Sequence, residues 1–303
     1  MQISQGLLNT ASCARKFQYL YLDRLAVPIP TEQQERLDWG TWFHRLLQRH
    51  ELGLIEFICN APPVLPSQQA SNQPVSNEQL PNEPATDPAT DPINPVEAQM
   101  LGAVEQLIHS HPQLFQPQPD TRRYSEHRRT LSYQGHILTA IYDLLILTAD
   151  RADIIDWKTY PRPESIDRLK HHWQTQLYLY LLVETSQFQP EQVSMTYWFV
   201  AGNGQSGQSG QSGQSGQSPQ SLQFSYNRTW HRQIQESLGT QLAQIDRWIA
   251  AYEQGEQLPQ SGKLLQQCDQ CVFRPRCQPE FPDITHATRR DRDEFDPRNI
   301  LRV

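Results

Sequence analysis

Apolar residues in the middle of the chain follow first the period of strands and then that of a helix. Residues 136–148 (HILTAIYDLLILT) and 152–159 (ADIIDWKT) are rich in β-branched and aliphatic side chains, and a polar turn separates them. This pattern predicts a β-hairpin. Residues 165–186 carry apolar side chains at helical spacing, which predicts a helix directly after the second strand.

The same periodicities extend over most of the chain and predict strands that alternate with helices. Such an order is typical of an α/β fold, with a central mixed sheet flanked by helices. The predicted elements are helix 4–22, helix 37–54, helix 96–110, strand 122–133, strand 136–148, strand 152–159, helix 165–186, strand 192–200, strand 221–226 and helix 228–254.

Two stretches have too few apolar residues to fold. Residues 61–96 are dominated by Pro, Gln, Asn, Ser, Asp and Glu, and residues 203–220 are mostly a Gly-Gln-Ser repeat. Neither can offset the entropy lost on ordering, so we expect both to be disordered. They divide the chain into an N-terminal helical part, a core, a C-terminal part with a strand, a helix and cysteines, and a mobile tail: residues 1–60, 97–202, 221–280 and 281–303.

The net charge of −7 argues at first against a nucleic acid as partner. Residues 61–100, however, contain five carboxylates and no Lys or Arg, which leaves −2 for the rest of the chain. A near-neutral body with local basic patches can bind a polyanion. The alternative for the basic residues of strand 122–133 is an edge strand protected by its charge. The candidate patch consists of Arg122, Arg123, Arg128 and Arg129.

Two carboxylates and a lysine on the predicted hairpin carry the candidate chemistry. Asp156 and Lys158 point to the same face of their strand, because side chains alternate along it. Asp143 interrupts an apolar strand, where a carboxylate is costly to bury without a partner. A divalent ion would remove that cost, and beside a lysine it can activate water against a phosphodiester. The alternative is a buried Asp–Lys pair without catalytic function.

Further polar side chains can complete such a site. Lys170, Gln174 and Tyr178 share one stripe of the predicted helix 165–186, which either lines a groove or is an ordinary solvated face. His44 lies among apolar residues of the predicted helix 37–54. It is either a satisfied core residue or a ligand for ions such as Mn²⁺.

Cysteine spacing is a second signal. Cys268, Cys271 and Cys277 form a C-x2-C-x5-C pattern, with Cys13 and Cys59 far upstream. The options are a disulfide, zinc or an iron–sulfur cluster, and Cys59 is expected to be a bystander. No signal peptide or long apolar run is evident, so we expect a cytoplasmic protein without a membrane partner, which disfavours disulfides. Zinc sites more often pair two C-x2-C units.

The order of these residues resembles that of the PD-(D/E)XK nuclease superfamily. The resemblance is to the branch that includes the nuclease domains of RecB and AddB and the CRISPR-associated RecB-like exonucleases. Tyr142 replaces the proline of the family signature, and the second carboxylate is Asp where Glu is frequent. The matching residues are His44, Asp143, Asp156-Trp157-Lys158 and Gln174-x-x-x-Tyr178, and the opening Ser4, Leu8, Cys13, Phe17 and Tyr21 is also similar to that branch.

This resemblance implies a restriction-endonuclease-like core and a role for each matching residue. Lys158 would orient or deprotonate the attacking water, while Gln174 and Tyr178 would position DNA and the metal-bound groups. It also implies a [4Fe–4S] cluster that joins the two ends of the chain, with zinc as the alternative at the same thiols. The implied ligands of Mg²⁺ or Mn²⁺ are His44, Asp143, Asp156 and the carbonyl of Trp157, and those of the cluster are Cys13, Cys268, Cys271 and Cys277.

We therefore expect a metal-dependent DNA exonuclease that acts on single-stranded ends in repair, recombination or foreign-DNA processing. The chain has no G-x-x-x-x-G-K-[ST] motif, so a helicase or CRISPR-adaptation partner would supply any unwinding. One alternative is a non-catalytic DNA-binding or scaffolding subunit of a helicase–nuclease complex that retains the fold and the cluster. A further alternative is a hydrolase that acts on a substrate other than nucleic acid and whose cysteines bind a structural zinc.

Overall fold

The computed structural model describes residues 1–27, 29–55, 95–200, 218–260, 268–269 and 271–277. Cys59 and the tail 281–303 lie outside these residues, as does most of each stretch expected to be disordered. Helix α4 begins at Pro95 and strand β6 begins at Gln220, so the last residues of both ranges expected to be disordered belong to regular elements. Where the structure describes the chain, no helix is long and apolar enough to cross a membrane.

Within the described residues, six strands form one mixed sheet, which confirms the predicted α/β architecture. β3 and β4 are antiparallel, as the predicted hairpin requires, and β4 pairs with β5 in parallel. β2 runs along one edge of β3, whereas β1 and β4 pair with β3 at its beginning and end. The strands are β1 (Gln2–Ile3), β2 (Arg122–Tyr133), β3 (His136–Leu147), β4 (Ala152–Lys158), β5 (Val193–Phe199) and β6 (Gln220–Ser225).

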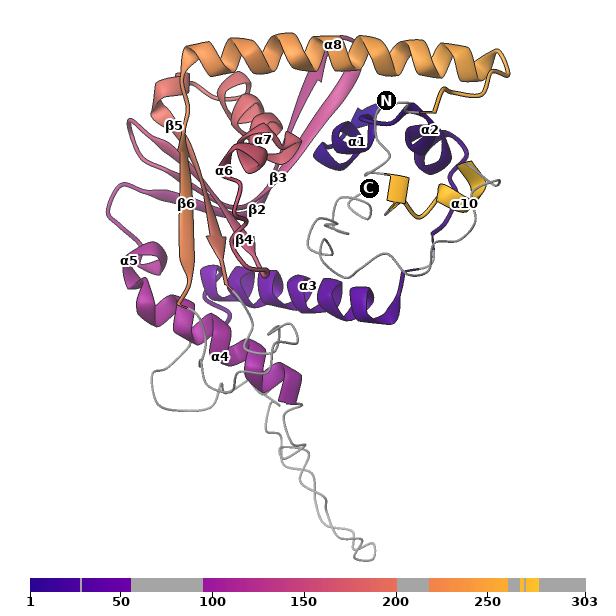
Figure 1. The fold of residues 1–303 in the computed structure, drawn as a ribbon. Coiled ribbons are helices and arrows are strands. Elements are labelled where there is room, and N and C mark those ends of the chain that lie inside the picture. The colour runs from indigo at the N-terminus through magenta and orange to yellow at the C-terminus, as the bar shows by residue number, and fades with distance from the viewer. Residues whose placement is uncertain (28, 56–94, 201–217, 261–267, 270, 278–303) are drawn as a thin grey trace, which may run out of the picture.

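Helices cover both faces of this sheet (Figure 1). On one face lie α7 (Trp173–Glu184) and α8 (Arg228–Glu253), and on the other lie α3 (Thr31–Glu51), α4 (Pro95–Ser110) and α5 (Pro112–Phe115). α8 is amphipathic, with a buried row at helical spacing that packs towards α7. Burial of this row removes apolar surface from water, which drives the packing of α8 on the rest of the fold. The buried row of α8 is Trp230, Ile234, Leu238, Leu242 and Ile245.

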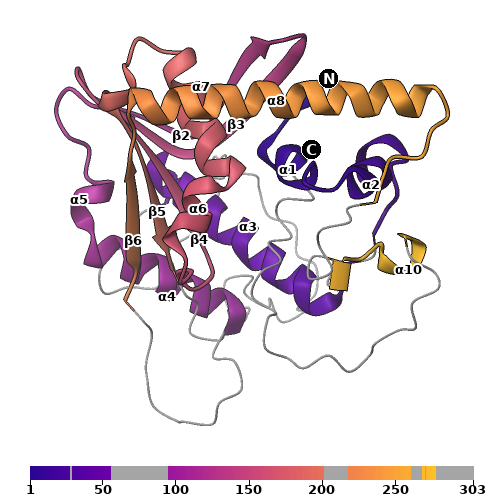
Figure 2. The ribbon, with the colours of Figure 1, turned by 45° about the horizontal axis from the view of Figure 1, so that its top comes forward.

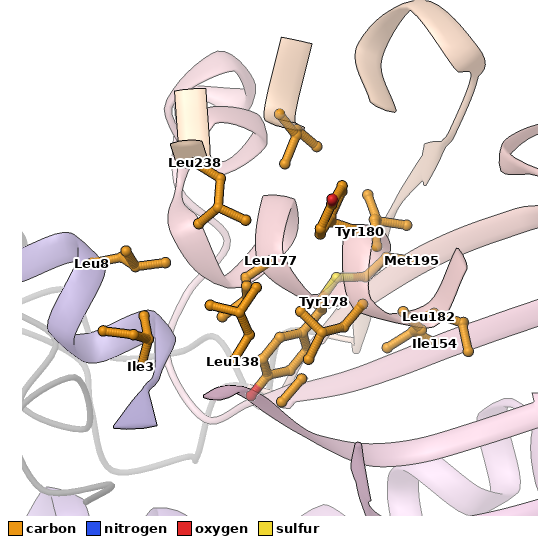
Figure 3. Packing of buried hydrophobic residues seen from close by; sticks show 14 of the residues in the cluster. Ile3, Leu8, Leu138, Ile154, Leu177, Tyr178, Tyr180, Leu182, Met195 and Leu238 are labelled. Atoms are coloured by element: carbon orange, nitrogen blue, oxygen red, sulfur yellow. The ribbon is translucent and has the colours of Figure 1, made fainter. Parts of the chain in front are cut away.

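Each face of the sheet has its own apolar cluster. Under α7 and α8 lie large side chains from the sheet and the helices, including Tyr178, Tyr180 and Met195 (Figure 3). Under α3 and α4 lie Phe43 and Leu47 together with side chains of β3 and β4. The cluster to which a strand residue belongs therefore shows which face of the sheet its side chain occupies.

The predicted helix 4–22 is interrupted. α1 (Gln5–Thr10), capped by the Ser4 hydroxyl, ends before the extended Cys13, from which α2 (Ala14–Phe17) and a π-turn (Gln18–Leu22) continue. The predicted helix 37–54 begins earlier, at Thr31, and ends at Glu51. Its first turns are polar, so they carry no apolar period, yet Glu, Gln and Arg are good helix formers.

The predicted helix 165–186 is also two helices, which overturns the single polar stripe. α6 (Ile166–His171) ends before His172, whose backbone is extended, and α7 starts at Trp173. The break turns Lys170 away from the stripe, so that its ammonium lies 4.9 Å from the centre of the Trp230 ring. Periodicity missed the break because apolar spacing continues across it.

Near the N-terminal helices, α10 (Arg274–Cys277) lies beside α2 (Figures 1 and 2). The Phe273 ring packs 5.1 Å from that of Tyr19, and Arg15 donates to the carbonyl of Leu258 at 2.6 Å. Segments more than 240 residues apart in sequence therefore meet at this corner of the molecule.

Candidate active site

β4 separates from β3 where their two aspartates face each other, and we call this point the fork. The ladder between these strands ends at the pair Leu144–Ile155, so Asp143 and Asp156 are next in register but no longer paired. Oδ2 of Asp143 accepts the backbone N–H of Trp157 at 2.8 Å. The carboxylate thus takes the place of a ladder carbonyl, which satisfies a buried donor at the fork.

A shift in the pleat turns Asp143 towards α3. Tyr142 and Leu145 are three residues apart, yet both pack in the cluster under α7, while Leu144 packs in the cluster under α3. In a regular strand, residues three apart lie on opposite faces. Asp143 and Leu144 therefore lie at the point where the alternation resets, and the carboxylate faces the helix that carries His44.

Asp156, Lys158 and Gln174 form a closed polar group on the other side of the fork. The Lys158 ammonium lies 2.6 Å from Oδ2 of Asp156 and donates to the Gln174 side-chain oxygen at 2.9 Å. The Gln174 amide in turn donates to Oδ1 of Asp156. All three residues are at most 5% exposed. Burial raises the pKa of Asp156, and the Lys158 ammonium opposes that rise.

His44 connects the two halves of the fork from α3. Its Nε2 lies 3.1 Å from the carbonyl oxygen of Trp157, and its Nδ1 lies 3.3 Å from Oδ1 of Asp143. Neighbouring ligands around a Mg²⁺ ion lie about 3 Å apart, because the ligand bonds are about 2.1 Å long and roughly perpendicular. The spacing of Nε2 and the Trp157 carbonyl fits two such neighbours. The donor set fits a divalent ion.

The structure therefore brings together most of the residues expected at the site. Tyr178 lies elsewhere: its side chain is 2% exposed, and its ring packs 5.3 Å from that of Tyr142, edge to face, in the core (Figure 3). Its role in positioning DNA stays a prediction, and a direct contact with DNA would require the core to open.

The four arginines do not form one surface. Arg123 makes a two-point ion pair with Glu51 at the end of α3 and also donates to the carbonyl of Leu114 at 2.9 Å. Arg129 donates to the carbonyl of Thr185 at 2.7 Å, on the opposite face of the sheet. Only Arg122 and Arg128 of the four point to solvent as exposed residues. The candidate patch is thus reduced to two residues.

Glu126 is a site residue that the sequence reasoning missed. Its Oε1 lies 3.9 Å from Nδ1 of His44, and Glu126, His44 and Asp143 each offer a ligand atom within 4.8 Å of the others. Counting back from the Gln134-Gly135 turn pairs residue 126 with residue 143, so the hairpin register could have revealed it.

The four cysteines expected to act together do converge. Cys13 immediately precedes α2, Cys268 and Cys271 belong to one turn, and Cys277 ends α10. Burial raises the pKa of the Cys277 thiol, the Arg15 guanidinium opposes that rise, and the thiolates of the other three cysteines add to it. The four cysteines line one pocket together with three basic residues, which are Arg15, Lys16 and Arg274.

A family model of the PD-(D/E)XK nuclease superfamily matches residues 3–278, nearly the whole chain. The chain belongs to this superfamily. The restriction-endonuclease-like fold expected from the residue order is confirmed by this match and by the mixed sheet. No curated protein matches the chain.

Members of the superfamily are metal-dependent nucleases, so this PD-(D/E)XK protein is assigned to that general class. A nuclease fold of this kind implies DNA binding. At the fork, Asp143 lies on β3 and Asp156-Trp157-Lys158 lies on β4, with Asp143 and Asp156 next in register. The group of His44, Glu126 and Asp143 is a further set that could hold a metal.

Proposed function

We propose that the protein is a Mg²⁺- or Mn²⁺-dependent deoxyribonuclease that works as an exonuclease on single-stranded DNA ends. One observation carries the proposal: Asp143 and Asp156 are next in register at the fork of β3 and β4, where Lys158 pairs with Asp156 and His44 of α3 pairs with Asp143. Two carboxylates, an imidazole and an ammonium with this arrangement suit hydrolysis of a phosphodiester bond.

Asp143, Asp156, His44 and the carbonyl of Trp157 would hold the ion. When bound, the ion neutralises phosphate charge and lowers the pKa of water. The chain's own contribution is to keep Lys158 in place. Its ammonium is fixed between Asp156 and Gln174 and lies 5.3 Å from the centre of the Tyr197 ring. There it can orient the attacking water and offset negative charge that develops on the phosphate.

The direct test uses end-labelled single- and double-stranded oligonucleotides with Mn²⁺ or with EDTA. Wild-type protein should shorten single strands with Mn²⁺, and Asp156→Asn and Lys158→Ala should not. Asp153→Asn is the matched control, because Asp153 lies three residues earlier on β4 and bonds to Ser194 instead of the site. A protein that binds DNA equally in EDTA and never shortens it would be the scaffolding subunit instead.

We also propose that the four cysteines hold a [4Fe–4S] cluster. The four thiols come from the two ends of the described chain and line one pocket, as ligands of a shared metal group must, and four thiolates can hold either this cluster or a single zinc. The neighbouring Arg15, Lys16 and Arg274 can balance the negative charge of the thiolates.

Metal analysis of anaerobically purified protein tests the cluster. We expect about four irons and four acid-labile sulfides per chain in the wild type, and neither in Cys271→Ser. Cys59→Ser is the matched control and should retain both. One zinc per chain without acid-labile sulfide would show that the four cysteines bind zinc instead of a cluster.

A helicase or CRISPR-adaptation protein would supply single-stranded ends, and a cytoplasmic location would keep the four thiols reduced. Co-purification from the source cells, followed by identification of bound proteins, tests the partner.

A further inference from the structure

Strand β2 lies at the edge of the sheet and carries a row of one basic and two aromatic side chains on one face. Where the structure describes the chain, β2 pairs with β3 alone. Paired residues of neighbouring strands share a face, so this row lies on the face that α7 covers. The row consists of Arg122, Tyr124 and His127, and their β3 partners Leu147, Leu145 and Tyr142 all belong to the cluster under α7.

The two aromatic side chains of the row contact each other and are anchored in the core. The ring centres of Tyr124 and His127 lie 5.0 Å apart, and Tyr124 is 37% exposed. The His127 ring stacks in turn on the Tyr142 ring, with 6.5 Å between centres. Tyr142 is fully buried, and its hydroxyl donates to the carbonyl of Tyr178 at 3.1 Å. Tyr124 is therefore the outer member of a row of rings whose inner members are fixed.

A strained backbone brings these two rings together. Glu126, which lies between them, is left-handed, with φ of 50°, in the middle of a 12-residue strand. Residues three apart lie on opposite faces of a regular strand, so Tyr124 and His127 share a face only because the alternation resets here. The reset also separates Arg123, which binds α3, from Arg129, which binds the end of α7. Strain of this kind persists where surrounding structure compensates for it, and it concentrates at functional sites.

The ring pair lies close to the fork. Glu126 falls opposite Asp143 in the register of β2 and β3, and its Oε1 lies 3.9 Å from Nδ1 of His44. Neighbouring strands are about 4.8 Å apart, so β2 is one strand spacing from Asp143 at this point. The Glu126 side chain is 30% exposed. Solvent, and hence a DNA strand, can therefore approach the fork from the edge that carries the rings.

An aromatic ring beside a guanidinium suits one nucleotide of a single strand. Arg122 is exposed and lies two residues before Tyr124, which places it about 7 Å away on the same face. Every base has a π-face that can stack on such a ring, while the guanidinium can bind a phosphate. Inside a duplex, both faces of a base are already stacked on its neighbours. The surface therefore favours an unpaired base.

We propose that Tyr124 and His127 form a stacking subsite for one unpaired base of the DNA beside the fork, and that Arg122 binds a phosphate of the same strand. The inference rests on the proposed function, because it takes single-stranded DNA as the substrate. It deepens that function by naming the strand of the protein that binds the substrate and the part of the nucleotide that is bound.

The first test measures the affinity for fluorescein-labelled single-stranded oligonucleotides by anisotropy, in EDTA so that no cleavage occurs. Tyr124→Ala should raise the dissociation constant about 10-fold, because it removes the ring on which the base stacks. Tyr124→Phe keeps the ring and should bind as the wild type does. Thr130→Ala is the matched control, since Thr130 is an exposed residue of the same strand beyond the ring pair. It should also bind as the wild type does.

A second measurement separates stacking from a structural role of the tyrosine. The probes are oligonucleotides that each lack one base, at successive positions from one end. The wild type should bind one of these probes about 10-fold more weakly than the others, and Tyr124→Ala should bind all of them alike. A purely structural role would weaken the binding of every probe and leave the dependence on position unchanged.

Wild-type affinity in Tyr124→Ala, or an unchanged dependence on the position of the missing base, would overturn the inference alone. A wild type that shows the stacking effect but never shortens DNA with Mn²⁺ would overturn the proposed nuclease function and support the subsite. A wild type that binds no single strand would overturn both, so the failures are distinguishable.

Discussion

Lys158 compensates the charge of Asp156 in a nearly water-free environment. The two charged atoms lie 2.6 Å apart, and the residues are 4% and 1% exposed. A buried pair of this kind contributes little net stability, but removal of one partner leaves the other charge uncompensated. Asp156 and Lys158 are therefore coupled in stability as well as in the proposed chemistry.

Lys158→Ala should lower the free energy of unfolding in EDTA by about 3 kcal/mol at pH 8. Without the ammonium, the pKa of Asp156 would rise further above that of an unfolded aspartate. The unfolded chain then ionises more readily, so the destabilisation should grow with rising pH and shrink at pH 5. Denaturant titrations at both pH values measure this. Equal losses at pH 5 and pH 8 would contradict it.

Protons should compete with the metal at Asp156. Since burial raises the pKa of this carboxyl, more of it is protonated as the pH falls, and an ion must displace that proton. Mn²⁺ affinity should therefore weaken between pH 8 and pH 6. Calorimetry in two buffers of different ionisation enthalpy would detect the released proton. Affinity that does not vary with pH would argue that Asp156 is not a ligand.

At the scale of elements, the close approach of α3 to β4 positions His44. Gly40 lies one turn before His44, and a Cβ at that position would be 3.4 Å from the Thr159 hydroxyl, at the end of β4. This distance is an ordinary contact for one methyl group and too short for a branched side chain. A larger residue would push the helix, and His44 with it, away from the strand.

Gly40→Ala should retain Mn²⁺ affinity, whereas Gly40→Val should weaken it about 10-fold by displacing His44. Gly102→Val on α4 is the control, because a Cβ there meets nothing within 4 Å. EPR titration and thermal unfolding of the three variants measure both properties. Unchanged affinity in Gly40→Val would show that the helix spacing does not set the site.

The arginines of β2 separate into structural and exposed members. Arg123→Ala should cost about 3 kcal/mol of stability, because it leaves Glu51 buried without its partner. Arg128→Ala should leave stability unchanged and should reduce the slope of log affinity for DNA against log salt concentration by about 1. Denaturation and fluorescence anisotropy at several salt concentrations separate the two. If Arg123→Ala weakened DNA binding without a loss of stability, Arg123 would belong to the DNA-binding surface after all.

At the scale of the whole molecule, the cysteines join the two ends of the matched region. A cluster between Cys13 and residues 268–277 would close a loop of more than 250 residues. Treated like a disulfide cross-link, that closure stabilises the fold by about 5.5 kcal/mol. The pocket is built from α2, α10 and their flanking residues, apart from the fork of β3 and β4.

Cys271→Ser should therefore lower the melting temperature under anaerobic conditions and still cleave DNA well below that temperature. Thermal scans and cleavage assays at 10 °C and 37 °C measure this, with Cys59→Ser as control. Loss of cleavage at 10 °C in a folded Cys271→Ser protein would instead assign the cluster a direct part in DNA processing.

Local pattern was sufficient for the strands and for the residue types of the site. The hairpin 136–159, the Asp and Asp-x-Lys pair and the cysteine triplet are all short-range features, because alternation and spacing depend on neighbours along the chain. Helix continuity was less predictable. The breaks at Cys13 and His172 are extended residues inside apolar periods, and periodicity does not register them.

Only the tertiary structure decided which polar residues meet. Glu126 joins His44, Arg123 turns to α3, Arg129 turns to the end of α7, and Tyr178 enters the core. The facing of Glu126 and of the two arginines depends on the pleat reset at Glu126, where one left-handed residue reverses the facing of the β2 residues beyond it. Tyr178 instead lies on α7 and is buried by the packing of that helix on the sheet. Composition and period determine which segments are strands. The packing of distant helices on both faces determines where a strained residue is tolerated, and hence which side chains reach the fork.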